Sequence, residues 1–404
     1  MFEPKLQGKN GQQSKRVLVA LGHLGLGDAV EAFPVYRMIK EHWPDVYLAV
    51  ACSNETQEII VGMAPDVSAR IRLKERFTED AFRALKHFLL TFKAMRGFDH
   101  ILILRFKRRV AWPDILAAKL TGAQIHHTHG LPDEYFIRRV FPDALVYQMM
   151  TARMLDVPLT TLRYPEIPLT NADRQFAKRF FEDRGLRDRP RVIINAGTYD
   201  SLMMGWLATA LGTVSWGIEN FVRVANALVV CGVDVLFNGG TDQQMRYIES
   251  ARSQLADTVV VIERTTAREL AAIISECDLL IGDHSGPVEL ASAVGTPVIT
   301  METGHSSWGP SYHHRTGPVW WPRRPSLTII TKADWCKASI GTDCRCMPST
   351  KRRRDLGKSL MKRLGVWKTW KKARRKIMRS SGIHGDQAAL ITYPCLEAIT
   401  VQEV

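Results

Sequence analysis

The stretch Leu279–Thr296, LLIGDHSGPVELASAVGT, carries the clearest structural signal in the chain. Its apolar start is typical of a buried strand, and the polar turn Asp283–Gly286 separates that strand from a second apolar segment with helical spacing. Pro287 has no N–H and suits the first turn of a helix, whereas Gly295 is a usual helix end. Another apolar run follows. The stretch therefore predicts a strand–turn–helix–strand unit of a parallel sheet.

The turn inside this stretch has two interpretations. Ser285 or Gly286 is expected as the N-cap of the helix, so the free N–H groups of the first turn would face the carboxyl edge of the sheet. Phosphate groups are common ligands of such helix starts, and ligands of parallel sheets bind at this edge. A strand–helix connection also needs a glycine-containing turn when nothing binds there. The turn alone leaves both interpretations open.

Composition places the chain among proteins with two domains. It has 404 residues, 46% of them hydrophobic, and a domain commonly contains roughly 100 to 200 residues. No apolar stretch approaches the roughly 20 residues that a membrane span needs, and the start lacks the apolar core of a signal peptide. Seven cysteines without an export signal argue against a disulfide framework. We therefore expect a cytoplasmic protein.

Apolar runs alternate with segments of helical spacing in both halves of the chain, which is the pattern of parallel α/β folds. Strands are predicted at 16–21, 46–52, 101–104, 124–127, 191–196, 233–237, 258–262, 278–281 and 298–301. Helices are predicted between Asp28 and Pro44 and at 79–95, 113–120, 172–184, 219–230, 243–255 and 267–277. The predicted organisation is a polar tail (1–15), an α/β domain (16–155), a proline-rich linker (156–170), a second α/β domain (171–330) and a cysteine-containing region (331–404). The predicted fold class is α/β, with two doubly wound parallel sheets facing a cleft.

The glycine-rich loop after the first predicted strand does not indicate a nicotinamide enzyme. Its glycines are spaced G-x-x-G-x-G over Gly22–Gly27, whereas dinucleotide-binding loops read G-x-G-x-x-G. Asp28 follows these glycines directly. Aspartate is a good cap for the helix expected there, which is a structural explanation of this residue.

Several short motifs, taken in order along the chain, resemble the bacterial heptosyltransferases of glycosyltransferase family 9. The motifs are Gly25–Asp28, Asn238–Gln243, Thr265–Leu270, Gly282–Pro287 with Glu289–Ala291 and Gly295–Pro297, Gly304–Pro310, and Pro394–Leu396 with Val401–Val404. The resemblance implies a GT-B-type fold and transfer of a sugar, with heptose from ADP-heptose favoured. It also implies a lipopolysaccharide-like or other lipid-linked glycan acceptor and no catalytic metal.

The resemblance also assigns roles to individual residues. It makes Asp28 the general base for the acceptor hydroxyl, and it places the donor diphosphate at the loop from Asp283 to Pro287. The donor-binding residues implied in this way are Gly25, Gly27, Thr198, Gln243, Asp283, His284, Ser285, Gly286 and Pro287. For Asp28, the base and the helix cap are therefore competing interpretations.

One departure from the family pattern supports an alternative function. A helix N-terminus contributes roughly 0.3 to 1 kcal/mol to anion binding, and up to about 2 kcal/mol when partly buried, so a cation is expected beside the diphosphate. The family has a Lys or Arg in the stretch that matches Thr213–Gly217, and none is present here. A non-catalytic nucleotide-sugar-binding or membrane-docked partner protein is therefore the alternative.

Most of the net charge of +14 belongs to one segment. Residues 351–379 contain fourteen Lys or Arg and a single acid, Asp355. Leucines and tryptophans recur there at helical spacing, and a basic amphipathic helix of this kind indicates an anionic membrane surface, here the inner face of the membrane. A solvated insertion is the simpler explanation. Nucleic-acid binding is not favoured, because no recognised module is present.

Four cysteines lie in the region 331–404, at Cys336, Cys344, Cys346 and Cys395. Four thiolates suit zinc or iron, so we expect a structural metal there. Their spacing is not that of a standard zinc ribbon, and four unlinked thiols are the other possibility. Cys52, Cys231 and Cys277 end predicted strands or helices and are expected to be packing residues.

Overall fold

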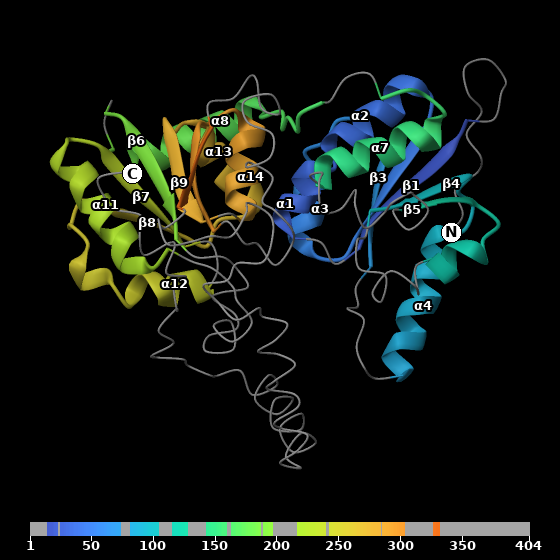
Figure 1. The fold of residues 1–404 in the computed structure, drawn as a ribbon, viewed down its shortest axis with the longest axis horizontal. Helices are drawn as coiled ribbons and strands as arrows, with labels where there is room; N and C mark the ends of the chain where they lie inside the picture. Colours follow the sequence, from blue (N-terminus) through green and yellow to red (C-terminus); the bar gives the residue numbers. More distant parts are fainter. Residues whose placement is uncertain are drawn as a thin grey trace, which may run out of the picture. The chain divides into compact units, whose positions relative to one another are not determined.

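The computed structural model describes residues 14–22, 25–73, 81–104, 115–127, 143–159, 163–186, 189–196, 216–239, 242–283, 285–303 and 326–331. The chain forms two compact units, each of which contains one parallel sheet (Figure 1). The first unit takes its residues from Met1–Leu186, Thr265–Cys277 and Gly286–Pro297, and the second takes them from Arg187–Arg264, Asp278–Ser285 and Val298–Val404.

The sheet of the first unit has five parallel strands in the order β3-β2-β1-β4-β5. The strands are β1 (Arg16–Gly22), β2 (Tyr47–Cys52), β3 (Ala69–Arg72), β4 (His100–Ile103) and β5 (Gln124–His127). Its central strand β1 reads RVLVALG, and Val17, Leu18 and Val19 are fully buried. A continuous apolar run is expected in a strand that is covered on both faces, which explains why this strand was easy to predict.

The helices of the first unit come from separate parts of the chain. They are α1 (Leu26–Glu31), α2 (Phe33–His42), α3 (Glu55–Val61), α4 (Ala81–Met95), α7 (Asp143–Leu155), α8 (Asn171–Glu182), α13 (Ala267–Ser275) and α14 (Gly286–Val294). Figure 1 shows α2 and α7 side by side, and α13 between α8 and α14. The part of the chain with described structure has no helix long and apolar enough to cross a membrane.

The single helix predicted between Asp28 and Pro44 is wrong in one respect, because the structure has two. A turn at Ala32 separates α1 from α2, and Pro34 lies in the first turn of α2. Proline has no N–H to donate to the carbonyl four residues before it, so a helix running through this point would lose that hydrogen bond. Proline at the start of a new helix avoids the loss.

A partly buried ion pair joins α8 to α13 in the first unit. Arg268 donates to both carboxylate oxygens of Asp173, over 2.7 and 2.8 Å. Asp173 also accepts the N–H and the hydroxyl of Thr170, the N-cap of α8. The hydrogen bonds from Arg268 are the main reason why the pKa of Asp173 is lowered to about 2. Both helices thus share one anchoring carboxylate.

The sheet of the second unit has six parallel strands in the order β11-β10-β9-β6-β7-β8. The strands are β6 (Arg191–Asn195), β7 (Asp234–Gly239), β8 (Val260–Glu263), β9 (Leu279–Asp283), β10 (Val298–Thr303) and β11 (Ser326–Thr331). The unit also contains α11 (Ile218–Val230), α12 (Asp242–Glu249) and the short 3₁₀ helix η2 (Arg252–Gln254). The predicted helix 243–255 is therefore α12 followed by η2. All the strands point the same way, so their carboxyl ends lie at one edge.

Candidate functional site

The predicted turn of the second unit lies at the carboxyl end of β9. Strand β9 ends at Asp283, and α14 begins at Gly286 with Pro287 as its second residue. Ser285 therefore occupies the N-cap position, one of the two residues predicted for it. Its hydroxyl donates to the carbonyl oxygen of Asp283 over 2.9 Å. This bond closes the turn between the strand and the helix.

Gly282 is required by the close approach of the neighbouring strand β6. A Cβ atom at this position would lie 2.6 Å from the carbonyl oxygen of Asn195 and 3.1 Å from its Cβ. Real Cβ atoms do not approach backbone oxygen so closely, and backbone atoms of a central strand cannot move aside. The glycine of the motif thus makes room for Asn195, which the sequence analysis did not identify as a site residue.

Asn195 is the centre of a buried group of polar side chains. Its Oδ1 accepts hydrogen bonds from the Asn238 amide over 2.7 Å and from the Gln244 amide over 3.1 Å. Its Nδ2 donates to the Ser285 hydroxyl over 2.9 Å. Asn195 and Asn238 are almost completely buried. The signal in the sequence was an asparagine at or near the carboxyl end of two neighbouring apolar strands.

Asp283 has a structural role in the described residues. Its side chain is 2% exposed, and its Oδ1 accepts the main-chain N–H of Trp216 over 3.0 Å. Trp216 is fully buried and packs edge-on against Phe221. The carboxylate therefore ties the end of β9 to the residue Trp216, just before α11. Trp216 belongs to the stretch Thr213–Gly217, where the family pattern has a basic residue and this chain has none.

In the first unit, the glycine loop and α14 are brought together. Helix α1 packs against α14, and a Cβ at Gly27 would lie 3.1 Å from Cγ of Glu289. A Cβ at Gly286 would lie 2.7 Å from Cβ of Leu26. Both glycines, predicted as donor-binding residues, thus allow the two helices to approach closely.

Asp28 is the third residue of α1 and is partly buried. Its Oδ2 accepts the N–H of Gly25, the N-cap residue, over 2.7 Å. Asp28 therefore caps its own helix, as the structural interpretation predicted. A carboxylate has about four lone-pair sites, so this capping bond is compatible with a second role as a base.

Other predicted site residues lie outside the described part of the chain. These are Thr198, His284, the cysteines Cys336, Cys344, Cys346 and Cys395, and the basic segment 351–379. The main chain of Gln243 lies in the first turn of α12, but its side chain is not described. Among the described residues no group of three or more His, Cys, Asp or Glu could hold a metal ion. Cys52 and Cys277 are buried as predicted, whereas the prediction for Cys231 is wrong because it is exposed.

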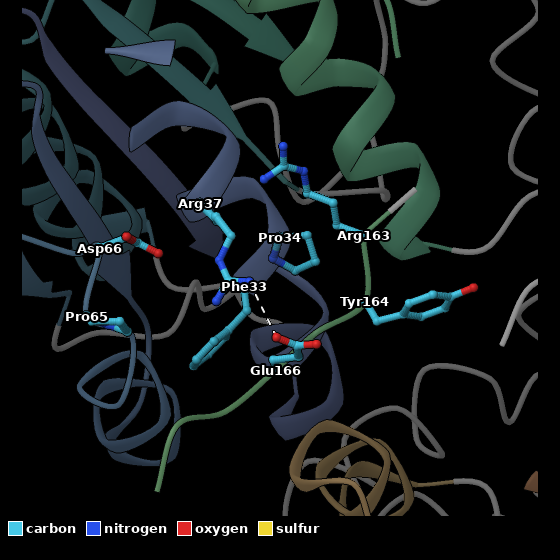
Figure 2. A pocket seen from close by; sticks show the side chains of 8 residues that line it. All are labelled: Phe33, Pro34, Arg37, Pro65, Asp66, Arg163, Tyr164 and Glu166. Carbon is cyan, nitrogen blue, oxygen red and sulfur yellow. Dashed lines mark hydrogen bonds and ion pairs between the residues drawn. The ribbon is translucent and has the colours of Figure 1, made fainter. Parts of the chain in front are cut away.

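A shallow hollow lies elsewhere in the first unit, beside α2 (Figure 2). Two ion pairs occur at it, from Arg37 to Glu166 over 3.4 Å and from Arg163 to Glu41 over 2.6 Å. The hydrogen bond from Arg163 lowers the pKa of Glu41. Because each guanidinium is matched by a carboxylate, the hollow offers an anion little net charge. No predicted site residue lines it.

The chain is similar in sequence to known sugar-transferring enzymes. Residues 143–349 match the model of glycosyltransferase family 9 (heptosyltransferase). Lipopolysaccharide heptosyltransferase 3 of Escherichia coli is 23% identical over 307 residues, which is 70% of this chain and 83% of that protein.

Two solved structures share the fold. The family 9 glycosyltransferase of Veillonella parvula DSM 2008 has a TM-score of 0.60 at 18% identity, covering 78% of this chain and 86% of that one. The E. coli ADP-heptose lipopolysaccharide heptosyltransferase II has a TM-score of 0.57 at 14% identity. The match covers 86% of this chain and 99% of that one. Because the family model spans just over half of the chain, the protein belongs to glycosyltransferase family 9 and is a sugar-transferring enzyme with a GT-B-type fold.

Proposed function

We propose that this enzyme transfers a heptose from ADP-heptose to a lipid-linked, lipopolysaccharide-like acceptor. The donor and the acceptor are those named by relatives, namely lipopolysaccharide heptosyltransferase 3 and ADP-heptose lipopolysaccharide heptosyltransferase II of E. coli. The observation that carries the proposal is the turn from Asp283 to Gly286, which ends a central parallel strand and starts a helix. A diphosphate is the group that such a helix start suits best.

In the proposed reaction the acceptor hydroxyl oxygen attacks the anomeric carbon of the donor sugar. The bond from that carbon to the diphosphate oxygen breaks, and the electron pair leaves with ADP. Asp28 takes the hydroxyl proton, and the main-chain N–H groups of Gly286 and Val288 stabilise the charge on the departing diphosphate. Pro287 contributes no N–H. Under this proposal no divalent metal takes part, as the resemblance to family 9 implies.

The proposal extends to the segments beyond the described residues. Residues 351–379 would hold the enzyme against an anionic leaflet on the cytoplasmic side, at about 1 kcal/mol per basic residue near the surface. The cysteines Cys336, Cys344, Cys346 and Cys395 would hold a structural zinc or iron ion. Metal analysis of the purified chain, and sedimentation with anionic vesicles before and after deletion of 351–379, test the two parts separately.

A turnover assay tests the main proposal. The full chain is incubated with ADP-heptose and a heptose-free lipopolysaccharide core acceptor, and ADP release is followed with and without EDTA. We expect acceptor-dependent ADP release that EDTA does not abolish. Release of ADP only from other donors would overturn the choice of sugar. Loss of release in EDTA that added Mg²⁺ restores, and added Zn²⁺ does not, would overturn the metal-free mechanism.

A non-catalytic nucleotide-sugar-binding protein is the second candidate. It is favoured by two observations, namely the lack of a basic residue in Thr213–Gly217 and the capping bond that occupies one oxygen of Asp28. Calorimetry with ADP-heptose and ADP separates the candidates, because binding without turnover on any lipopolysaccharide core acceptor supports the second.

A further inference from the structure

We infer that Asn195 is a positioning residue for the turn that follows β9, and that it acts through the hydroxyl of Ser285. The chain of hydrogen bonds around Asn195 has a single possible direction. The carbonyl oxygen of Asp283 can only accept, so the Ser285 hydroxyl donates its one hydrogen to it and must accept from Nδ2 of Asn195. Oδ1 of Asn195 then faces Asn238 and Gln244, whose amide nitrogens donate to it.

The hydroxyl of Ser285 links Asn195 to the backbone. It accepts from Nδ2 of Asn195 and donates its only hydrogen to the carbonyl oxygen of Asp283. The result is a relay from two side-chain amides, through Asn195 and Ser285, to the last carbonyl of β9. Three segments of the second unit, namely β6, β7 and α12, thereby fix the backbone between the strand and the helix.

Burial makes this relay costly to break. Asn195 is 0% exposed, Asn238 1%, Gln244 8% and Asp283 2%. Ser285 is partly buried. A buried amide that loses its partner cannot turn to water, so Asn195, Asn238 and Gln244 hold one another in place. Gly282 admits the Asn195 side chain to this position, because a side chain there would collide with residue 195.

The relay has a consequence for the donor, which rests on the proposed function. The hydrogen of Ser285 is committed to a backbone carbonyl, so this hydroxyl does not donate to the diphosphate. Main-chain N–H groups at the start of α14 bind the diphosphate instead, and their direction depends on the turn that Asn195 holds. Asn195 does not contact the donor itself.

Asn195→Asp breaks the relay at one bond. The carboxylate still accepts from Asn238 and Gln244, but it cannot donate to Ser285, whose hydroxyl would turn toward it and leave the Asp283 carbonyl. Amide hydrogen exchange of the ligand-free protein measures the result. We expect exchange in the peptide covering 279–290 to rise about tenfold, the effect of one lost buried hydrogen bond.

Asn226→Asp is the matched control. Asn226 also lies in the second unit, where its side chain donates to the carbonyl of Gln254 over 2.7 Å and accepts the N–H of Ala256 over 2.9 Å. The control likewise removes one donated hydrogen bond and adds one carboxylate. It should leave exchange at 279–290 unchanged. Equal exchange in Asn195→Asp and the parent protein would overturn the inference.

A double-mutant cycle with Ser285→Ala tests whether Asn195 acts through Ser285. ADP affinity is measured by calorimetry for the parent, both single variants and the double variant. Each single change should weaken ADP binding about tenfold, and the double variant should bind no more weakly than the weaker single one. If Asn195→Asp acts by its charge alone, its effect persists in the Ser285→Ala background and the factors multiply.

The ADP-binding and hydrogen-exchange measurements distinguish failure of the proposed function from failure of the inference about Asn195. If the parent protein does not bind ADP, the proposed function is wrong for this donor, whereas hydrogen exchange still decides whether Asn195 holds the turn. If Asn195→Asp is not folded, Ser285→Ala alone must raise exchange at 279–290, since it removes the same bond to Asp283. Unchanged exchange in that variant contradicts the inference.

Discussion

Asp28 has one structural contact that can be separated from its proposed role as a base. Its Oδ2 accepts the N–H of Gly25 over 2.7 Å at the start of α1. The Asp28→Asn variant would present an amide oxygen to the same N–H, whereas the Asp28→Ala variant would present no acceptor. Because it keeps this capping bond, Asp28→Asn should lower the free energy of unfolding mainly through its lost charge at the helix start, by about 0.3 to 1 kcal/mol. Asp28→Ala should cost about 1 kcal/mol more, the value of a lost cap.

Sugar transfer should respond differently to the same two variants. Neither an asparagine nor an alanine side chain can accept a proton at neutral pH, so both variants should lower kcat by about 10² to 10⁴, the usual contribution of a general base. Urea unfolding measures the stability of each variant, and ADP release at saturating donor and acceptor measures kcat. We therefore expect the two variants to differ in their free energy of unfolding but to share the same reduced kcat.

Glu269 supplies the control for this experiment. It is the third residue of α13, and its Oε2 accepts the N–H of the N-cap Thr266 over 2.7 Å, which is the same capping geometry. Glu269→Gln should match Asp28→Asn in stability and leave kcat unchanged. If Asp28→Asn retains the kcat of the parent, Asp28 is a helix cap only and the proposed mechanism is refuted.

Three further predictions concern stability. Gly282→Ala should lower the free energy of unfolding in urea by about 1 to 3 kcal/mol, because its Cβ would lie 2.6 Å from the Asn195 carbonyl oxygen; an unchanged midpoint contradicts the close approach. Arg268 lowers the pKa of Asp173 to about 2 from 3.8, so the ion pair stabilises the fold fully above pH 3.8, and this stability is lost as the pH falls through 2. Acid unfolding of Asp173→Asn should lack that step. Burial lowers the pKa of His126 to about 4 from 6.5, so the unfolded chain binds a proton first and stability should fall as the pH drops from 6.5 to 4. In His126→Gln, unfolding curves across that range should be flatter.

Local signals were sufficient to predict the unit from Leu279 to Thr296. An apolar run, a polar turn, Pro287 and Gly295 each act within a few residues, and the structure has β9 and α14 there, with β10 starting directly afterwards at Val298. Pro34 was a signal for the break at Ala32, because proline is disfavoured inside a helix and favoured in its first turn. The apolar spacing on both sides of Ala32 nevertheless favoured a single helix. The edge strand β3 was missed although its sequence, ARIR, alternates apolar with charged residues as a half-exposed strand does, because four residues are the shortest length at which this pattern can be recognised.

The contacts of the candidate site could not be predicted in the same way. Asn195 and Ser285 are 90 residues apart, and Asp283 and Trp216 are 67 apart. Such pairs form only when parallel strands are placed next to one another, and the order β9-β6-β7 is not written in any single segment. The sequence thus indicated the turn correctly but contained no sign that Asp283 is turned inward.

The parallel order of the second sheet also bears on how donor preference could change during evolution. The segments after β6, β7, β9 and β10 all leave from one edge, whereas the apolar strands behind them supply the rigid frame. Replacement of such a segment alters what meets a ligand without altering the frame. Related enzymes with different donors could therefore arise by exchange of the connections after β6 and β10, whereas the connections after β7 and β9 supply Gln244 and Ser285 to the Asn195 relay and would be kept.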